Sequence, residues 1–139
     1  MTPQEIATKS AQALWQEDTA SQNMQMVLDK VGPGWAEMTL HIEPHHCNGH
    51  GTCHGGISFA LADSCFAFAC NSYNQRHVGQ HNHISYIRPI QLGDTIRAIA
   101  KEVSKTTNSG IYDISVYNQN EVKCIEMRGW SRRVAGSLY

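Results

Sequence analysis

The sequence predicts an α+β domain in which an antiparallel sheet curls around one long buried helix. The chain has 139 residues, a length typical of a single hydrophobic core. Its hydrophobic pattern indicates a helix, two strands, a second helix that is apolar on nearly all sides, and then four strands. One buried helix in this order supplies too few crossovers for a parallel sheet. The strands are therefore expected to pair antiparallel around it.

The first elements are a short amphipathic helix over residues 3–18 and a strand pair over residues 25–31 and 35–43. Pro3 suits a first helical turn, and the sequence Gly32-Pro33-Gly34 is a strong turn signal between the strands. The second strand alternates apolar and polar residues, as a half-buried strand does. We expect residues 1–23 to form an N-terminal helix and connection, residues 24–134 the main domain, and residues 135–139 a tail.

A loop rich in glycine and histidine, residues 44–56, precedes the second helix over residues 57–70. Leucine and repeated alanine favour helix here, and Asp63 is the only carboxylate of the segment. Four strands follow over residues 81–88, 94–105, 110–118 and 121–134, the last two joined as a hairpin. Three cysteines in apolar runs are expected in the core: Cys65, Cys70 and Cys124.

Composition excludes several classes of protein. The net charge of −1 argues against a nucleic-acid binder, and no segment approaches the ~20 apolar residues of a membrane helix. Five cysteines, an odd number, and no export signal predict reduced thiols in the cytoplasm. The first 75 residues hold two basic and seven acidic side chains, whereas residues 76–139 hold nine and five. This asymmetry indicates a local anionic ligand, or else ordinary surface scatter.

The most informative segment runs from Asn48 to Gly56 and reads Asn-Gly-His-Gly-Thr-Cys-His-Gly-Gly. Gly55 and Gly56 open the second helix, where free backbone N–H groups and the positive end of the helix dipole favour a developing oxyanion. Glycine also allows a substrate carbonyl to approach the backbone closely. The side-chain amide of Asn48 offers a further donor to the same oxygen.

Asp63 lies eight residues after Gly55, which is ~12 Å along a helix axis. The Gly55 amide and the Asp63 carboxylate of the same chain therefore cannot both reach one carbonyl group. Two copies of the helix, packed antiparallel about a twofold axis, would place Asp63 of one subunit opposite Gly55 of the other. The sequence thus predicts a dimer with two composite sites.

A carboxylate in an apolar helix is costly unless it is hydrogen-bonded or used in chemistry. Asp63 could activate water or attack an electrophile directly. The alternative is a structural carboxylate that binds serine or backbone donors.

Two other chemistries use the same loop. Six side chains could form a metal cluster: His45, His46, Cys47, His50, Cys53 and His54. The spacing of the two cysteines is looser than in usual zinc sites, and no second cysteine pair follows. One of these cysteines could instead pair with a histidine as a nucleophile, although no acylation signature surrounds either.

Several motifs together resemble those of the hotdog-fold acyl-CoA thioesterases, of the PaaI type associated with phenylacetic acid degradation. They are the Asn48–Gly56 segment, Leu61-Ala-Asp63, the run Phe66–Ser72, Arg88-Pro89 and Gly93-Asp94. The resemblance covers roughly residues 24 to 134, and the interval from Asn48 to Asp63 is its most specific part.

The resemblance implies hydrolysis of an acyl-CoA thioester, with Asp63 as base or nucleophile. It implies that Asn48 and the Gly55 amide polarise the thioester carbonyl and that His54 supports the loop. Such proteins are homodimers, usually paired into homotetramers, and need no metal or other cofactor. Their substrates include ring-hydroxylated phenylacetyl-CoA.

The chain departs from this family in one place. Some relatives carry a serine or threonine near the catalytic carboxylate, early in the strand before Arg-Pro. Here that stretch reads Gly79-Gln80-His81-Asn82-His83, and we expect Gln80 or His81 to take the role.

For the CoA arm we expect Gly56 and four arginines, because guanidinium suits phosphate geometry: Arg88, Arg128, Arg132 and Arg133. For each arginine, an ordinary solvated side chain is the alternative. Two other functions stay open, a non-catalytic module that binds acyl-CoA or an aromatic ligand, and a metal-dependent enzyme.

Overall fold

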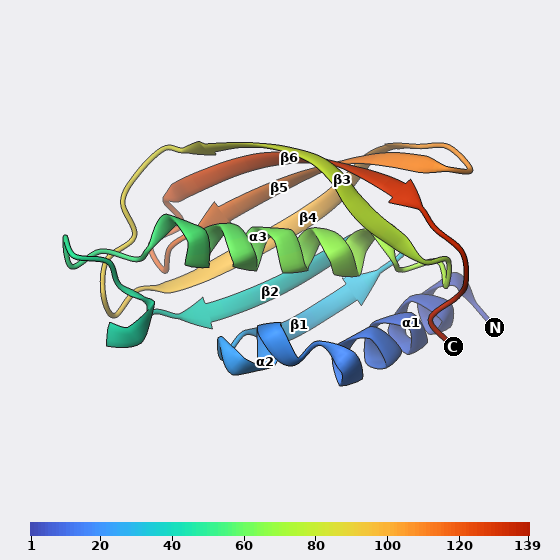
Figure 1. Ribbon diagram of the computed structural model, residues 1–139, viewed down its shortest axis with the longest axis horizontal. Helices are drawn as coiled ribbons and strands as arrows, with labels where there is room; N and C mark the ends of the chain where they lie inside the picture. Colours follow the sequence, from blue (N-terminus) through green and yellow to red (C-terminus); the bar gives the residue numbers. More distant parts are fainter.

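The computed structural model describes residues 1–139 and shows a six-stranded antiparallel sheet that curves around one central helix (Figure 1). The strands are β1 (Val27–Gly32), β2 (Trp35–His41), β3 (His77–Tyr86), β4 (Thr95–Lys105), β5 (Ser109–Tyr117) and β6 (Lys123–Arg133). Their order in the sheet is β1-β2-β4-β5-β6-β3, and every neighbouring pair is antiparallel. The predicted sheet around a single helix is therefore confirmed.

The N-terminal segment holds two helices where the sequence predicted one. Helix α1 spans Pro3–Glu17, with Pro3 in its first turn as expected. A further short helix, α2 (Thr19–Asn23), follows directly. Asp18 separates the two helices, and its side chain caps α2 by accepting a hydrogen bond from the N–H of Ser21 at 2.9 Å.

The central helix α3 (Gly55–Cys70) lies across the concave face of the sheet, after a single turn of 3-10 helix over Pro44–His46. It begins two residues earlier than the apolar pattern alone indicated. Its sheet-facing side is fully buried and includes Leu61, Cys65 and Phe66. The opposite side is half-buried and carries Ala60, Asp63, Ser64 and Ala67, spaced at three and four residues. The apolar pattern therefore predicts the burial of the side of α3 that faces the sheet, whereas the opposite side is only half-buried.

Strand β3 lies at one edge of the sheet and pairs only with β6. It begins four residues before the predicted start, at His77. A bulge between Gly79 and His81 interrupts its register with β6. Its other edge has no strand partner in the chain, so this ten-residue strand presents unpaired backbone groups.

All five cysteines are free thiols, and the three that were predicted in the core are buried there. None of the helices combines the length and the apolar character that crossing a bilayer requires.

Candidate functional site

His54 fixes the beginning of α3. It is the N-cap residue, and its Nδ1 accepts a hydrogen bond from the N–H of Gly56 at 2.8 Å. The expectation of two free glycine amides is therefore wrong for Gly56, whose N–H is already occupied. The N–H of Gly55 has no hydrogen-bond partner in the chain and stays available to a ligand oxygen.

Asn48 lies in the loop before α3 with its two amide atoms in different roles. Its Oδ1 accepts hydrogen bonds from the N–H of His50 at 2.9 Å, and from the N–H and hydroxyl of Thr52, both at 3.3 Å. Its Nδ2 makes no hydrogen bond within the chain. The loop thus fixes the side chain through its oxygen and leaves the nitrogen free to donate.

A small pocket of about 180 Å³ opens beside the start of α3, between Gly55 and the segment that follows β3. The hydroxyls of Tyr86 and Ser58 both donate to the carbonyl oxygen of Gly55, at 2.9 and 3.1 Å. Arg88 also lines this pocket. Sequence reasoning missed Tyr86, because only the fold brings the end of β3 to the first turn of α3.

Asp63 lies half-buried in the middle of α3. Burial raises the pKa of its carboxyl above the usual range, and a hydrogen bond from Asn82 opposes that rise. The bond runs from Nδ2 of Asn82 to Oδ1 of Asp63 and is long, at 3.4 Å. The carboxylate lines a second pocket, of about 300 Å³, between α3 and the α1–α2 junction. A carboxyl with a raised pKa, open to a pocket, is suited to accept a proton.

Asn82, not Gln80 or His81, is the residue of β3 that contacts Asp63. The bulge after Gly79 shifts the alternation of β3, so that Gly79 and Asn82 both face α3. A Cβ atom at Gly79 would lie 3.9 Å from Oδ1 of Asp63. His81 faces the other side of the sheet, where its ring packs against Trp130. Within one chain, neither Gln80 nor His81 contacts Asp63, because the bulge changes the strand parity and directs Asn82 to α3 instead.

Gly55 and Asp63 line different pockets of the chain. The two residues are separated by eight positions of one continuous helix, which is ~12 Å along its axis. The structure of a single chain thus keeps the amide donors and the carboxylate apart.

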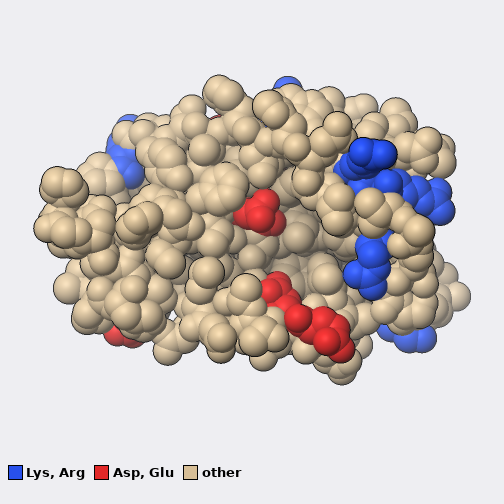
Figure 2. All heavy atoms as spheres, viewed as in Figure 1, with Lys and Arg blue, Asp and Glu red and all other residues tan.

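The four arginines considered for the CoA arm lie in different environments. Arg128 is held by Asp113 through two hydrogen bonds, at 2.7 and 2.8 Å, so its guanidinium is already paired. Arg132 and Arg133 are exposed at the end of β6, opposite the start of β3. Figure 2 shows basic atoms gathered mainly at the end of the molecule where the two termini lie, and acidic atoms over the middle of α3 and near the junction of α1 and α2.

The histidines and cysteines of the loop do not converge. No three His, Cys, Asp or Glu side chains lie close enough to hold a metal ion. His46 is buried, and its ring binds the N–H of Glu43 and the carbonyl of Met24. Burial and the neighbouring Cys47 raise the pKa of the Cys53 thiol to about 11, which opposes a role as nucleophile.

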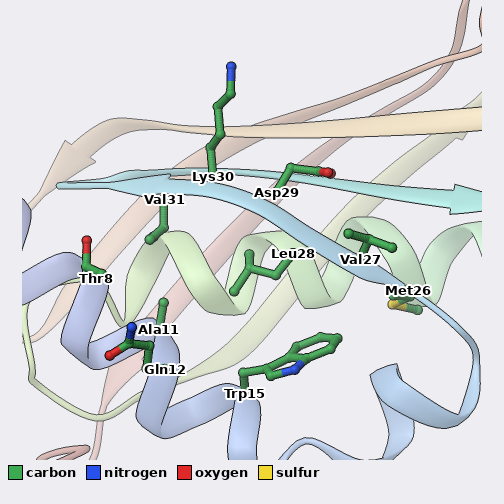
Figure 3. A pocket seen from close by; sticks show the side chains of 10 residues that line it. All are labelled: Thr8, Ala11, Gln12, Trp15, Met26, Val27, Leu28, Asp29, Lys30 and Val31. Atoms are coloured by element: carbon green, nitrogen blue, oxygen red, sulfur yellow. The ribbon is translucent and has the colours of Figure 1, made fainter.

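A further pocket, of about 580 Å³, lies between α1 and β1 and contains none of these groups. Figure 3 shows Ala11, Trp15, Leu28 and Val31 directed into this space, whereas Lys30 points away from it.

Comparison with known families decides what kind of protein carries this site. The family model described as the thioesterase superfamily matches residues 50–125, more than half of the chain. This chain belongs to the thioesterase superfamily. The hotdog fold and the enzyme class that the motifs implied, thioester hydrolysis, are thereby confirmed.

Individual members of the superfamily agree with this assignment. The chain is 33% identical over 132 residues to the acyl-coenzyme A thioesterase PaaI of Escherichia coli K12, covering 95% of this chain and 94% of that protein. It is 26% identical over 125 residues to human acyl-coenzyme A thioesterase 13, covering 85% and 89%. The solved structure of E. coli PaaI, from the phenylacetic acid degradation operon, has a TM-score of 0.96 at 32% identity and covers 98% of this chain and 99% of that one.

Proposed function

We propose that this superfamily member hydrolyses acyl-CoA thioesters to the free acid and CoA, at composite sites between two subunits. One observation carries the proposal. The same helix begins at an unpartnered amide, the N–H of Gly55, and bears a half-buried carboxylate, Asp63, eight residues later. Two such helices packed antiparallel bring each carboxylate to the amide of the partner.

The open edge of β3 supports this dimer. An edge strand of ten residues can pair with its copy across a twofold axis, which would join the two sheets and set the two α3 helices side by side. Each site would then contain Asp63 from one subunit and Gly55 with Asn48 from the other. Pairing of two dimers into a homotetramer is part of the proposal, on the basis of the resemblance.

In such a site, the N–H of Gly55 and Nδ2 of Asn48 would donate to the thioester oxygen, which gains negative charge as the carbonyl carbon is attacked. Asp63 would either take a proton from the attacking water or attack the carbon itself and form a mixed anhydride that water then cleaves. In both routes the carbon–sulfur bond breaks and CoA leaves as the thiolate. His54 would act through the loop, by capping α3 and orienting the Gly55–Gly56 turn.

The CoA arm has two groups of candidate partners. Arg88 lines the pocket of Gly55 and could meet a phosphate near the thioester, beside the Gly55–Gly56 turn. Arg132 and Arg133 lie near the carboxyl end of α3, because Arg133 pairs with His77, whose N–H donates to the C-cap residue Asn71. In an antiparallel pair of helices, that end extends past the start of the partner's α3, so these two arginines could bind phosphates of the same ligand. Arg128 is the weakest candidate, since Asp113 holds it.

For the acyl group we propose an aryl-acetyl moiety, such as ring-hydroxylated phenylacetyl. The similarity to E. coli PaaI, a protein of the phenylacetic acid degradation operon, supports this choice. So does the Asp63 pocket, whose apolar walls include Met24, Met26 and Ala60.

A panel of CoA esters, with release of free thiol as the readout, tests the proposal. Phenylacetyl-CoA and its hydroxylated derivatives are expected to be hydrolysed faster than short straight-chain esters. Replacing Asp63 by Asn is expected to abolish turnover while leaving the oligomer intact, because the amide is neither base nor nucleophile. Near-normal turnover of this variant would remove Asp63 from the mechanism. Binding without thiol release in the wild type would favour the non-catalytic module instead.

A further inference from the structure

Three residues form a hydrogen-bonded chain at the pocket that holds Asp63. The hydroxyl of Ser21 donates to Oδ2 of Asp18 at 2.6 Å, and the N–H of Ser21 donates to Oδ1 at 2.9 Å. The hydroxyl oxygen of Ser21 lies 2.8 Å from that of Ser64 on α3. All three residues line the pocket of about 300 Å³ that contains Asp63.

The chemistry of the chain fixes its direction. A hydroxyl has one hydrogen, and Ser21 gives its own to the carboxylate of Asp18, which can only accept. In the contact between the two serines, Ser64 must therefore be the donor and Ser21 the acceptor. The only hydroxyl hydrogen of Ser64 is then engaged by Ser21, while the lone pairs of the Ser64 oxygen stay free beside the pocket. Toward a ligand, Ser64 can therefore accept a hydrogen bond but cannot donate one.

We propose that Ser64, oriented by Ser21 and Asp18, is a subsite that accepts a hydrogen bond from a hydroxyl group on the acyl moiety. This inference rests on the proposed function, because it assumes that the Asp63 pocket receives the acyl group. The apolar walls, which include Met24, Met26 and Ala67, contact the remainder of that moiety. Since polar groups that bind a hydroxyl reject an analogue lacking it, the subsite discriminates between otherwise identical esters.

The charged groups that line the pocket also limit which acyl groups can bind there. Two carboxyl groups, those of Asp18 and Asp63, line it, and no Lys or Arg does. An acyl group with its own carboxylate would meet like charge there. The subsite therefore fits a neutral hydroxyl, not a dicarboxylic acyl chain.

Matched esters test the subsite. The ratio of kcat/KM is measured for 3- or 4-hydroxyphenylacetyl-CoA against phenylacetyl-CoA, with thiol release as the readout. One neutral hydrogen bond corresponds to a preference of roughly 3- to 10-fold for the hydroxylated ester that reaches Ser64. Ser64→Ala is expected to bring this ratio close to one.

Two further variants separate the subsite from a general effect of removing a hydroxyl. Ser21→Ala removes the acceptor of the Ser64 hydrogen, so Ser64 is no longer held as an acceptor and the ratio is expected to fall. Ser115→Ala is the matched control, because this serine binds Glu126 on the opposite side of the sheet at 2.6 Å. It is expected to keep the wild-type ratio, and the melting temperature of each variant checks its fold.

The outcomes distinguish the two proposals. Thiol release without any preference in the wild type, or a preference that survives Ser64→Ala, overturns the subsite and leaves the thioesterase proposal standing. Absence of thiol release from every ester overturns both. A preference that is lost in Ser64→Ala and kept in Ser115→Ala supports the subsite.

Discussion

At the scale of single residues, the side-chain amide of Asn48 has two roles, one in holding the loop and one proposed in stabilising the oxyanion. Its oxygen orders the loop, while its nitrogen has no partner in the chain. Replacing it by alanine removes both functions, whereas Asn48→Asp keeps the accepting oxygen and removes the donor.

Both substitutions are therefore expected to lower kcat/KM, by roughly 10²- to 10³-fold for the loss of one oxyanion donor. Only Asn48→Ala is also expected to lower the melting temperature. Steady-state kinetics and thermal unfolding of the two variants check this. Unchanged kinetics in Asn48→Asp would mean that the residue only shapes the loop.

Asn82 acts on Asp63 through one hydrogen bond that stabilises the ionised carboxylate. Burial raises the pKa of Asp63, and the amide opposes that rise, so removing the amide is expected to raise the pKa further. If Asp63 acts ionised, kcat/KM increases with pH through this pKa. The acidic limb of the pH profile is then expected to move to higher pH in Asn82→Ala.

Ser115→Ala is the control for Asn82, because Ser115 lies on the face of β5 that points away from α3, where it binds Glu126. It is expected to keep the wild-type profile. A limb that moves equally in both variants, or in neither, would show that Asn82 does not set the ionisation of Asp63.

At the scale of elements, the start of α3 depends on His54. Its ring nitrogen accepts the N–H of Gly56, which would otherwise be an unsatisfied donor in the first helical turn. His54→Ala is expected to lower the free energy of unfolding by about 0.5–2 kcal/mol, the usual cost of losing an N-cap. Urea unfolding measures this loss. His54→Asn, which restores an acceptor, is expected to recover part of it, and equal destabilisation in both would contradict the capping role.

The bulge in β3 shows where sequence reasoning about elements stops. The alternation of apolar and polar residues identified the strands, including the one that follows the Gly32-Pro33-Gly34 turn, where Gly34 has a φ of 75°. In β3, one extra residue changes which side chains face α3, and Gly79, at the bulge, is the one local signal of it. The sequence therefore pointed to Gln80 or His81, and the fold selected Asn82.

At the scale of the whole molecule, the proposed dimer can be tested by complementation. Asp63→Asn and Asn48→Ala subunits are co-expressed with different tags, and the mixed dimer is purified. One of its two composite sites then contains both intact residues, so activity of about half the wild-type value is expected. Each mutant homodimer is expected to be much less active. A mixed dimer no more active than its parents would place each complete site within one subunit.

The sequence by itself determined the fold class, the buried helix and the segment Asn48–Gly56 with Asp63, because periodicity, composition and glycine placement act locally along the chain. It also determined that one chain could not bring Gly55 and Asp63 together, because helix rise per residue is constant. Only the tertiary structure decided that His54 occupies the Gly56 amide, that Asn82 supports Asp63, and that Ser21 joins Ser64 across 43 positions of sequence. Such contacts depend on strand parity and on the packing of distant elements, which leave no periodic signal in the sequence.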